Sequence, residues 1–199
     1  MTLFIGLISG TSVDAVDAVL CDIQPDNQIQ LLHSYSHPIP AALQQELLAF
    51  GKSEYNGDAI DQLGQLDHQV GLLFADATNT LLKQSEHQAQ EIQAIGSHGQ
   101  TIKHAPNEIN PYSLQVGSPE EIARITNIRT VANFRKADIL AGGQGAPLAP
   151  LFHKFIFKKN KISEGVIINI GGICNLTNIN EIDEDIIAYD CGPGNCLID

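Results

Sequence analysis

A run of small and polar residues interrupts the first apolar segment of the chain. It consists of Gly10, Thr11, Ser12, Val13, Asp14, Ala15, Val16 and Asp17. Small residues let several backbone N–H groups point at one oxyanion, hydroxyl groups donate further hydrogen bonds, and a carboxylate can hold Mg²⁺ through water. The run therefore suits a phosphate group, although a string this short, taken alone, is more often a plain hairpin turn whose Thr and Ser side chains bond their own backbone. The Walker and Rossmann phosphate motifs do not occur in the sequence.

A second carboxylate, Asp190, follows the strand-like residues Ile186–Tyr189 and opens the glycine-rich turn 190–195. A carboxylate at the end of a strand can accept a proton from water if burial raises its pKa toward neutrality. It can also serve as the N-cap of a helix that starts near Pro193. The two roles are compatible, so Asp190 is a candidate general base.

Four more polar side chains are candidates for contacts with a ligand. His98 and Gln100 follow the short predicted strand Ile92–Ser97, and open α/β sheets present ligand groups at such strand ends. Arg135 and Asp138 precede the glycine-rich segment 141–147. A structural role, with satisfied hydrogen bonds, is the alternative for His98.

Hydrophobic periodicity predicts an α/β chain in which strands and helices position these residues. Alternating apolar residues predict strands, and an apolar stripe at spacings of three and four predicts helices. Ser118, followed by Pro at N1 and Glu at N3, predicts a helix start with a capping box. The first expected strand begins at Leu3 and leads to the turn at Gly10-Thr11-Ser12. The further expected strands are Val16–Ile23, Ile29–Tyr35, Ile92–Ser97, Leu114–Gly117 and Thr130–Phe134, and the expected helices are Ala41–Phe50, Ala59–Leu82, Pro119–Thr126 and Leu148–Phe157.

The plan of the opening hairpin is repeated late in the chain. An apolar strand, Val166–Ile170, is followed by the turn Gly171-Gly172 and a second strand, Ile173–Ile179. We therefore predict one domain over residues 1–160 and the incomplete start of a similar second domain over residues 161–199.

Composition excludes several classes of partner. The formal net charge is -12, with 11 Lys and Arg residues against 23 Asp and Glu residues. A surface for nucleic acid or an anionic membrane needs an excess of basic residues, so neither partner is expected. The chain shows neither a signal peptide nor an apolar run of membrane-spanning length, which predicts a cytoplasmic protein. Its four cysteines show no metal-binding spacing and are expected to be reduced.

Five segments together resemble the anhydro-N-acetylmuramic acid kinase family in identity and order: Gly6–Asp14, Gly96–Thr101, Ala141–Leu148, Asn169–Gly172 and Asp190–Asn195. The resemblance spans the whole sequence. It implies the RNase H-like (actin-like ATPase) fold of the sugar kinase, Hsp70 and actin superfamily, a mixed sheet with flanking helices. It also implies two such lobes with ATP in the cleft between them.

The resemblance further implies a role for each candidate residue. The run from Gly10 to Asp17 is similar to the family's loop for the ATP phosphates, and Asp190 matches the proposed general base. His98, Gln100, Arg135 and Asp138 would lie near the sugar. Mg²⁺ would accompany ATP, and the sugar and ATP would be the small-molecule partners; a homodimer is compatible with this reading.

Three departures from the family's pattern keep other functions open. Ala137 stands where the family usually has Arg, and Ala15 stands where it usually has Gly. The sequence is also much shorter than family members, so by itself it is expected to have negligible kinase activity. The alternatives are a non-catalytic remnant that binds sugar or phosphate, and a kinase of the same superfamily with another substrate.

Overall fold

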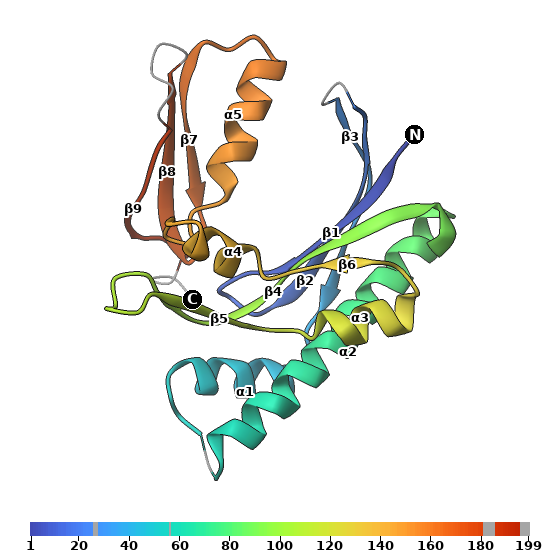
Figure 1. The fold of residues 1–199 in the computed structure, drawn as a ribbon, viewed down its shortest axis with the longest axis vertical. Coiled ribbons are helices and arrows are strands. Elements are labelled where there is room, and N and C mark those ends of the chain that lie inside the picture. The colour runs from blue at the N-terminus through green and yellow to red at the C-terminus, as the bar shows by residue number, and fades with distance from the viewer. Residues whose placement is uncertain (26–27, 56, 181–185, 196–199) are drawn as a thin grey trace. The chain divides into compact units, whose positions relative to one another are not determined.

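A computed structural model describes residues 1–25, 28–55, 57–180 and 186–195 of the chain (Figure 1). The chain divides into two compact units, Met1–Lys136 and Ala137–Asp199. Hereafter these are unit 1 and unit 2.

Unit 1 is built on a six-stranded mixed sheet in the order β3-β2-β1-β4-β5, with β6 paired to β4. Antiparallel pairing joins β1 to β2 and β2 to β3, whereas β4 runs parallel to β1 and to β6. This antiparallel meander followed by parallel strands confirms the predicted mixed sheet. The strands are β1 (Leu3–Ser9), β2 (Ala15–Ile23), β3 (Ile29–Pro38), β4 (Ile92–Ala105), β5 (Tyr112–Val116) and β6 (Thr130–Val131).

Helices cover one face of this sheet, with α2 lying across the strands and α3 beside it (Figure 1). The apolar stripe predicted for α2 is buried from Leu66 onward, except for the partly buried Leu73. Phe74 is fully enclosed, whereas Ile60 in the first turn is 80% exposed. Asp58 caps α2 by accepting a hydrogen bond from the Ile60 N–H at 2.8 Å. The helices of unit 1 are α1 (Ala41–Gly51), α2 (Ala59–Ser85) and α3 (Pro119–Thr126), with the 3-10 turn η1 (Ala89–Glu91).

The hydrophobic core lies between the sheet and α2. On β1 the residues Leu3, Ile5 and Leu7 alternate inward and are at most 4% exposed, as the period of two along a strand requires. Each large apolar side chain buried in this way contributes about 1.5–3 kcal/mol. The core therefore fixes the strands that carry the candidate residues of unit 1.

Two elements differ from the sequence prediction. β4 extends to Ala105, so His98 and Gln100 lie within the strand and not after its end. Its second half pairs with β5 as a hairpin, which lets a polar segment remain extended. The predicted strand Thr130–Phe134 is also wrong at its end, because pairing stops at Val131 and α4 (Phe134–Leu140) begins at Phe134. Asn133, with a left-handed φ of 62°, makes the transition.

Unit 2 repeats the antiparallel order of β1-β2-β3 in a three-stranded sheet, β7-β8-β9. The predicted turn Gly171-Gly172 joins β7 to β8. α5 packs on this sheet: a side chain at Gly165 would collide with the Phe157 ring, and His153 Nδ1 lies 2.9 Å from Thr177 Oγ1. The elements are α5 (Ala149–Lys159), β7 (Glu164–Ile170), β8 (Ile173–Asn180) and β9 (Ile187–Pro193).

Through these contacts α5 belongs to the same compact unit as β7 and β8. In unit 2, α5 shares its buried side with β7 and β8, and the domain boundary expected after residue 160 stays a prediction. Within the described residues, no helix has both the length and the apolar character that crossing a membrane requires.

Candidate sugar pocket and phosphate loop

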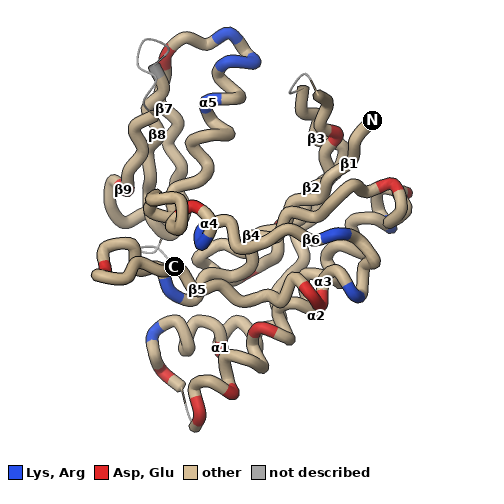
Figure 2. The backbone as a smooth tube through the Cα atoms, viewed as in Figure 1, with Lys and Arg blue, Asp and Glu red and all other residues tan. Residues whose placement is uncertain are grey.

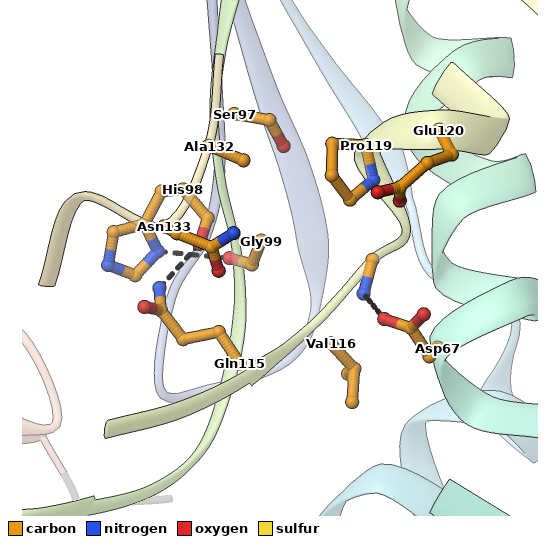
Figure 3. A pocket seen from close by; sticks show the side chains of 11 residues that line it. Asp67, Ser97, His98, Gly99, Gln115, Val116, Pro119, Glu120, Ala132 and Asn133 are labelled. Atoms are coloured by element: carbon orange, nitrogen blue, oxygen red, sulfur yellow. Dashed lines mark hydrogen bonds between the residues drawn. The ribbon is translucent and has the colours of Figure 1, made fainter. Parts of the chain in front are cut away.

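A polar cavity of about 200 Å³ opens in unit 1 where β6 stops pairing with β4 (Figure 3). Ligands of open α/β sheets bind at the carboxyl ends of parallel strands, which is where this cavity lies. β4, β5, the N-terminal end of α3, the segment after β6 and one residue of α2 form its wall. The lining residues are Asp67, Ser97, His98, Gly99, Gln115, Val116, Gly117, Pro119, Glu120, Ala132 and Asn133.

Two glycines keep the floor of the cavity open. Gly99 has a φ of +73°, and a Cβ there would lie 2.6 Å from the Val116 carbonyl oxygen. Gly117 has a φ of +117°, and its Cβ would approach Val70 to 3.1 Å. Both positions combine a left-handed backbone with a close approach, so a residue with a side chain would be strained at either one.

Ser97 brings an unused hydroxyl group to the cavity. Its side chain is 1% exposed, and its Oγ has no hydrogen-bond partner. Figure 3 shows this side chain extending from β4 toward Pro119 and Glu120. A buried hydroxyl without a partner costs about 1–3 kcal/mol, which a ligand hydroxyl or amide would recover.

His98 is held as a neutral ring by two hydrogen bonds. Its Nε2 accepts from Arg135 Nε at 3.0 Å, so the proton is on Nδ1, which donates to the Gly99 carbonyl oxygen at 3.0 Å. Burial lowers the pKa of His98 from its ordinary 6.5; the bond to Gly99 opposes this shift, and the charge of Arg135 adds to it. Gln115 Nε2 also donates to the His98 carbonyl oxygen. The imidazole is therefore rigid and unprotonated.

Two carboxylates at the cavity are tied to its backbone or its helix cap. Asp67 Oδ1 accepts from the Gly117 N–H at 2.8 Å, and Glu120 Oε2 accepts from Ser118 Oγ at 3.1 Å. Ser118 Oγ in turn caps α3 by accepting from the Glu121 N–H at 3.2 Å, as predicted. The reciprocal half of the capping box is not formed, because the Glu121 carboxylate pairs with Arg124.

The sequence prediction missed Asp67, Gln115, Glu120 and Asn133 as lining residues. Asp67 lies on the long helix α2 and Gln115 on β5, so only the tertiary fold brings them to His98. Glu120 was recognisable only as part of a helix start, and nothing in the sequence distinguishes Gln115 from other strand residues.

Gln100, the other strand residue predicted to read a substrate, does not line this cavity. It is 4% exposed, and its Nε2 donates to the Thr101 carbonyl oxygen at 3.2 Å. Its Oε1 is buried without a partner. The structure therefore joins His98 to Arg135 and leaves the Gln100 side chain buried two residues further along β4.

The predicted phosphate loop forms the exposed turn between β1 and β2. Val13 closes it by donating to the Gly10 carbonyl oxygen at 3.3 Å and is itself buried, with a left-handed φ of 53°. The N–H groups of Thr11 and Ser12 have no acceptor among the described residues. Nothing lies within 4 Å of a Cβ built on Gly10. The tip is thus open to an incoming oxyanion.

The remaining residues of this run either hold the loop in place or give it negative charge. Ser12 Oγ donates to Asp14 Oδ1 at 2.5 Å, and this bond is the main cause that lowers the pKa of Asp14. Asp17 accepts from the Ser36 hydroxyl. Ala15 begins β2, and Val16 is fully buried, so these two act through the backbone and the core.

In unit 2 Asp138 organises the glycine-rich loop. Its Oδ2 accepts from the Gly145 N–H at 2.7 Å, and its carbonyl oxygen accepts from the Gly143 N–H at 2.9 Å. A side chain on Gly143 would collide with the Asp138 carboxylate. Ala137 lies exposed on α4.

Asp190 lies within β9, opposite Asn175 of β8, and is exposed. Its place in the strand differs from the predicted place just beyond it, because pairing continues to Pro193. The helix expected to follow falls mainly on residues 196–199, outside the described residues. In the described part of the chain, no three His, Cys, Asp or Glu side chains gather as a metal site would require.

Comparison with known proteins identifies relatives of this chain. Over 197 residues it is 45% identical to an anhydro-N-acetylmuramic acid kinase of Coxiella burnetii, covering 98% of this chain and 51% of the relative. A kinase of the same name from Shewanella frigidimarina is 48% identical over 196 residues, covering 98% and 52%. The one from Vibrio cholerae is 45% identical over 197 residues, covering 99% and 52%. The chain thus spans about half the length of the curated relatives it matches.

Among solved structures, a reductive activator for a corrinoid, iron-sulfur protein resembles the fold with a TM-score of 0.51. It is 15% identical, and the match covers 96% of this chain and 31% of that one, so the likeness concerns the fold alone. The family model described as anhydro-N-acetylmuramic acid kinase matches residues 2–199. With nearly every residue inside that match, the chain belongs to the anhydro-N-acetylmuramic acid kinase family.

Proposed function

We propose that this chain forms one lobe and the start of the second lobe of an ATP-dependent kinase acting on 1,6-anhydro-N-acetylmuramic acid. Water adds to the anomeric carbon, the bond from that carbon to O6 breaks, and O6 takes the γ-phosphoryl group of ATP. The products are N-acetylmuramic acid 6-phosphate and ADP. The setting is peptidoglycan recycling in the cytoplasm.

The observation that carries this proposal is the polar cavity around His98. A bicyclic amino sugar presents hydroxyl, ether and amide groups, and the cavity offers the free Ser97 hydroxyl, the Gln115 amide and the carboxylates of Asp67 and Glu120. Sites for small molecules place a few such polar groups on a largely preformed wall. Gly99 and Gly117, where a side chain would be strained or crowded, keep that wall preformed.

The β1–β2 turn supports the assignment of a nucleotide phosphate site. The unpaired N–H groups of Thr11 and Ser12 and the open space at Gly10 suit a phosphate oxygen. In an acidic chain, phosphate must be held largely by backbone N–H groups and a metal ion. The β1–β2 turn can supply the backbone N–H groups.

Magnesium fits the same turn. The ion favours one or two carboxylates together with water and the phosphates of its nucleotide. Asp14 is exposed and its lowered pKa keeps it ionised, so Asp14, with Asp17 nearby in sequence, would hold the ion. There it would neutralise charge on the transferred phosphoryl group.

Asp190 is the proposed general base. Its carboxylate would take a proton from the water that attacks the anomeric carbon, and its exposure leaves it accessible to that water. The family resemblance supports this role. Asp138, which orders its loop through Gly145, would contribute to sugar binding, as the resemblance implies. Gln100 would act on the sugar site only indirectly, from the buried interior of β4.

Sugar binding by the 199-residue chain tests the proposal. Titration of ¹⁵N-labelled chain with 1,6-anhydro-N-acetylmuramic acid should shift the amide signals of Ser97, Gly99 and Gly117, and Ser97→Val should weaken binding by roughly tenfold. Thr78→Val, which removes another buried hydroxyl of unit 1 on α2, is the control. Absence of any shift at a millimolar sugar concentration would overturn the proposal.

A second candidate is a non-catalytic lobe that only binds sugar or phosphate, and Ala137, which stands where the family usually has Arg, favours it. Measurement of sugar-dependent ADP release separates the two. Turnover by the isolated chain excludes the binding lobe, and turnover that appears only with a longer polypeptide identifies this chain as part of the kinase.

A further inference from the structure

Two free cysteines lie on neighbouring strands of unit 2. Cys174 is on β8 and Cys191 is on β9, and neither is part of a disulfide. In the antiparallel register Cys174 faces Gly192, whereas the next residue of β8 faces Asp190. Cys191 is therefore the extra residue of a β-bulge, and it lies next to the direct partner of Cys174.

The bulge lets the two thiols face each other. In a regular strand Cys191 and Gly192 would point to opposite faces of the sheet, but a bulge re-aims a side chain. The pKa of Cys191 is raised, first by desolvation and then by the charge and the hydrogen bond of the Cys174 thiol, so the two groups are in contact. Facing residues have Cα atoms about 4.5–5.5 Å apart, and disulfides span Cα distances of about 4.4–6.8 Å. A bond between the two sulfur atoms is within reach.

Hydrogen bonds beyond the bulge hold the end of β9 against the start of β8. The Gly194 N–H donates to the Gly172 carbonyl oxygen at 2.9 Å, and the Asn195 N–H donates to the Gly171 carbonyl oxygen at 2.7 Å. A Cβ on Gly194 would lie 3.2 Å from the Cys174 nitrogen, so the two backbones are in close contact there. The cysteines are thus held side by side by the backbone.

The surroundings of the two thiols favour the reduced form until an oxidant is in excess. The described residues of β8 and β9 include no Lys or Arg that would stabilise a thiolate (Figure 2). Cys191 is exposed, so a small reagent can reach its sulfur. Its raised pKa leaves most of it as the unreactive thiol at neutral pH. Oxidation should therefore be slow.

We propose that Cys174 and Cys191 form a reversible disulfide that fastens β9 to β8 and makes this pair an oxidation site of the chain. The oxidant is a low-molecular-weight disulfide such as oxidised glutathione. The Cys191 thiolate attacks one of its sulfur atoms and releases one small thiol, and the Cys174 thiolate then attacks the Cys191 sulfur and releases the second. The two protein sulfurs lose two electrons, the small disulfide gains them, and the cysteine protons end on the two released thiols.

The disulfide should protect β9 from local opening. β9 is an outer strand of the described sheet β7-β8-β9, and amides of such a strand exchange when it opens locally. The bond closes a loop of roughly 18 residues, for which the chain-entropy model gives a stabilisation on the order of a hundredfold. Amides of β9 should therefore exchange up to about a hundredfold more slowly in the oxidised chain. Asp190 directly precedes Cys191, so the same bond restrains the backbone of that carboxylate.

The test treats the 199-residue chain with millimolar oxidised glutathione, both as the native sequence and as Cys196→Ser, which removes a competing thiol. Cleavage after glutamate separates Cys174 from Cys191, because Glu181 and Glu184 lie between them. Mass spectrometry should find the two peptides joined, with two hydrogen atoms fewer than their sum, and dithiothreitol should release them. Cys191→Ser in the Cys196→Ser background is the matched control and should give no joined peptides.

Hydrogen exchange of the oxidised and reduced chains is the second measurement. Slower exchange confined to unit 2 supports the proposal, and equal exchange of the β9 amides overturns it. Separate glutathione adducts on Cys174 and Cys191, or links from either one to Cys21 or to a second chain, would show that the two thiols do not meet. Lack of reaction after a day with oxidised glutathione and with diamide also overturns the inference.

Discussion

At the scale of single residues, His98 works as a hydrogen-bond acceptor only while it is neutral. Protonation would place a positive ring against Arg135 and remove the lone pair that accepts its Nε–H. The carboxylates of Asp67 and Glu120 line the same cavity, yet neither bonds to the ring. Burial is therefore the main influence on the pKa of His98, and it lowers that pKa.

A depressed pKa makes the stability of unit 1 depend on pH through His98. The folded state binds a proton at His98 less readily than the unfolded state does. The stability that neutral His98 contributes is therefore complete above the ordinary pKa of 6.5, and it is lost as pH falls through the lower pKa of the folded state. Urea unfolding at a series of pH values should show the native chain losing stability relative to His98→Gln below that point. Parallel profiles for the native chain and His98→Gln would refute this linkage.

Sequence patterns could identify His98 but not its partners. A regular strand would place His98 and Gln100 on one face, because side chains alternate with a period of two. The left-handed φ of Gly99 breaks that alternation, so His98 reaches the cavity and Gln100 does not. Backbone irregularities of this kind depend on the neighbouring strand, so the residue types alone do not predict them.

At the scale of elements, Gly99 and Gly64 allow opposite predictions for the same substitution. Gly99→Ala should destabilise unit 1 by about 1–3 kcal/mol, because φ is positive and the new methyl group meets the Val116 carbonyl oxygen. Gly64→Ala on the exposed side of α2, where nothing lies within 4 Å, should stabilise it by about 0.5–1 kcal/mol. Chemical denaturation measures both. Equal effects of the two substitutions would contradict the geometry at Gly99.

The start of α3 provides a second prediction for an element of the cavity wall. Ser118→Ala removes the hydroxyl that accepts from the Glu121 N–H and should cost about 1 kcal/mol. Sugar affinity should also fall, because Pro119 and Glu120 line the cavity. Ser118→Thr keeps the cap and is the matched control. A Ser118→Ala variant with native stability would show that the cap does not support the helix.

Periodicity predicted the elements with a strong apolar pattern and missed those without one. The stripe of α2 is unambiguous over many turns, and its buried members agree with it from Leu66 onward. The second half of β4 is polar and owes its extended form to pairing with β5. α4 is short and has no buried residue, so no apolar stripe marks it.

At the scale of the whole molecule, the main core belongs to one unit. Its buried members run from Leu3 to Ile128 and all lie in unit 1. Unit 2 buries far less, and one side of its sheet exposes large apolar side chains. These are Val166, Ile168, Ile170, Ile187 and Tyr189. The repeated strand–glycine–strand pattern predicted two lobes, but it could not show that α5 packs with the second.

This distribution of the core predicts different behaviour for the two units when each is produced alone. Residues 1–136 keep every member of the core cluster and should unfold in one cooperative transition, with a stability of about 5–15 kcal/mol. Residues 137–199 have little more than the contacts of α5 with its sheet, so denaturation should be gradual. Circular dichroism against urea concentration distinguishes a sigmoidal from a gradual curve. A gradual curve for residues 1–136 would mean that the core needs unit 2, and a cooperative one for residues 137–199 would mean that a three-stranded sheet with one helix suffices.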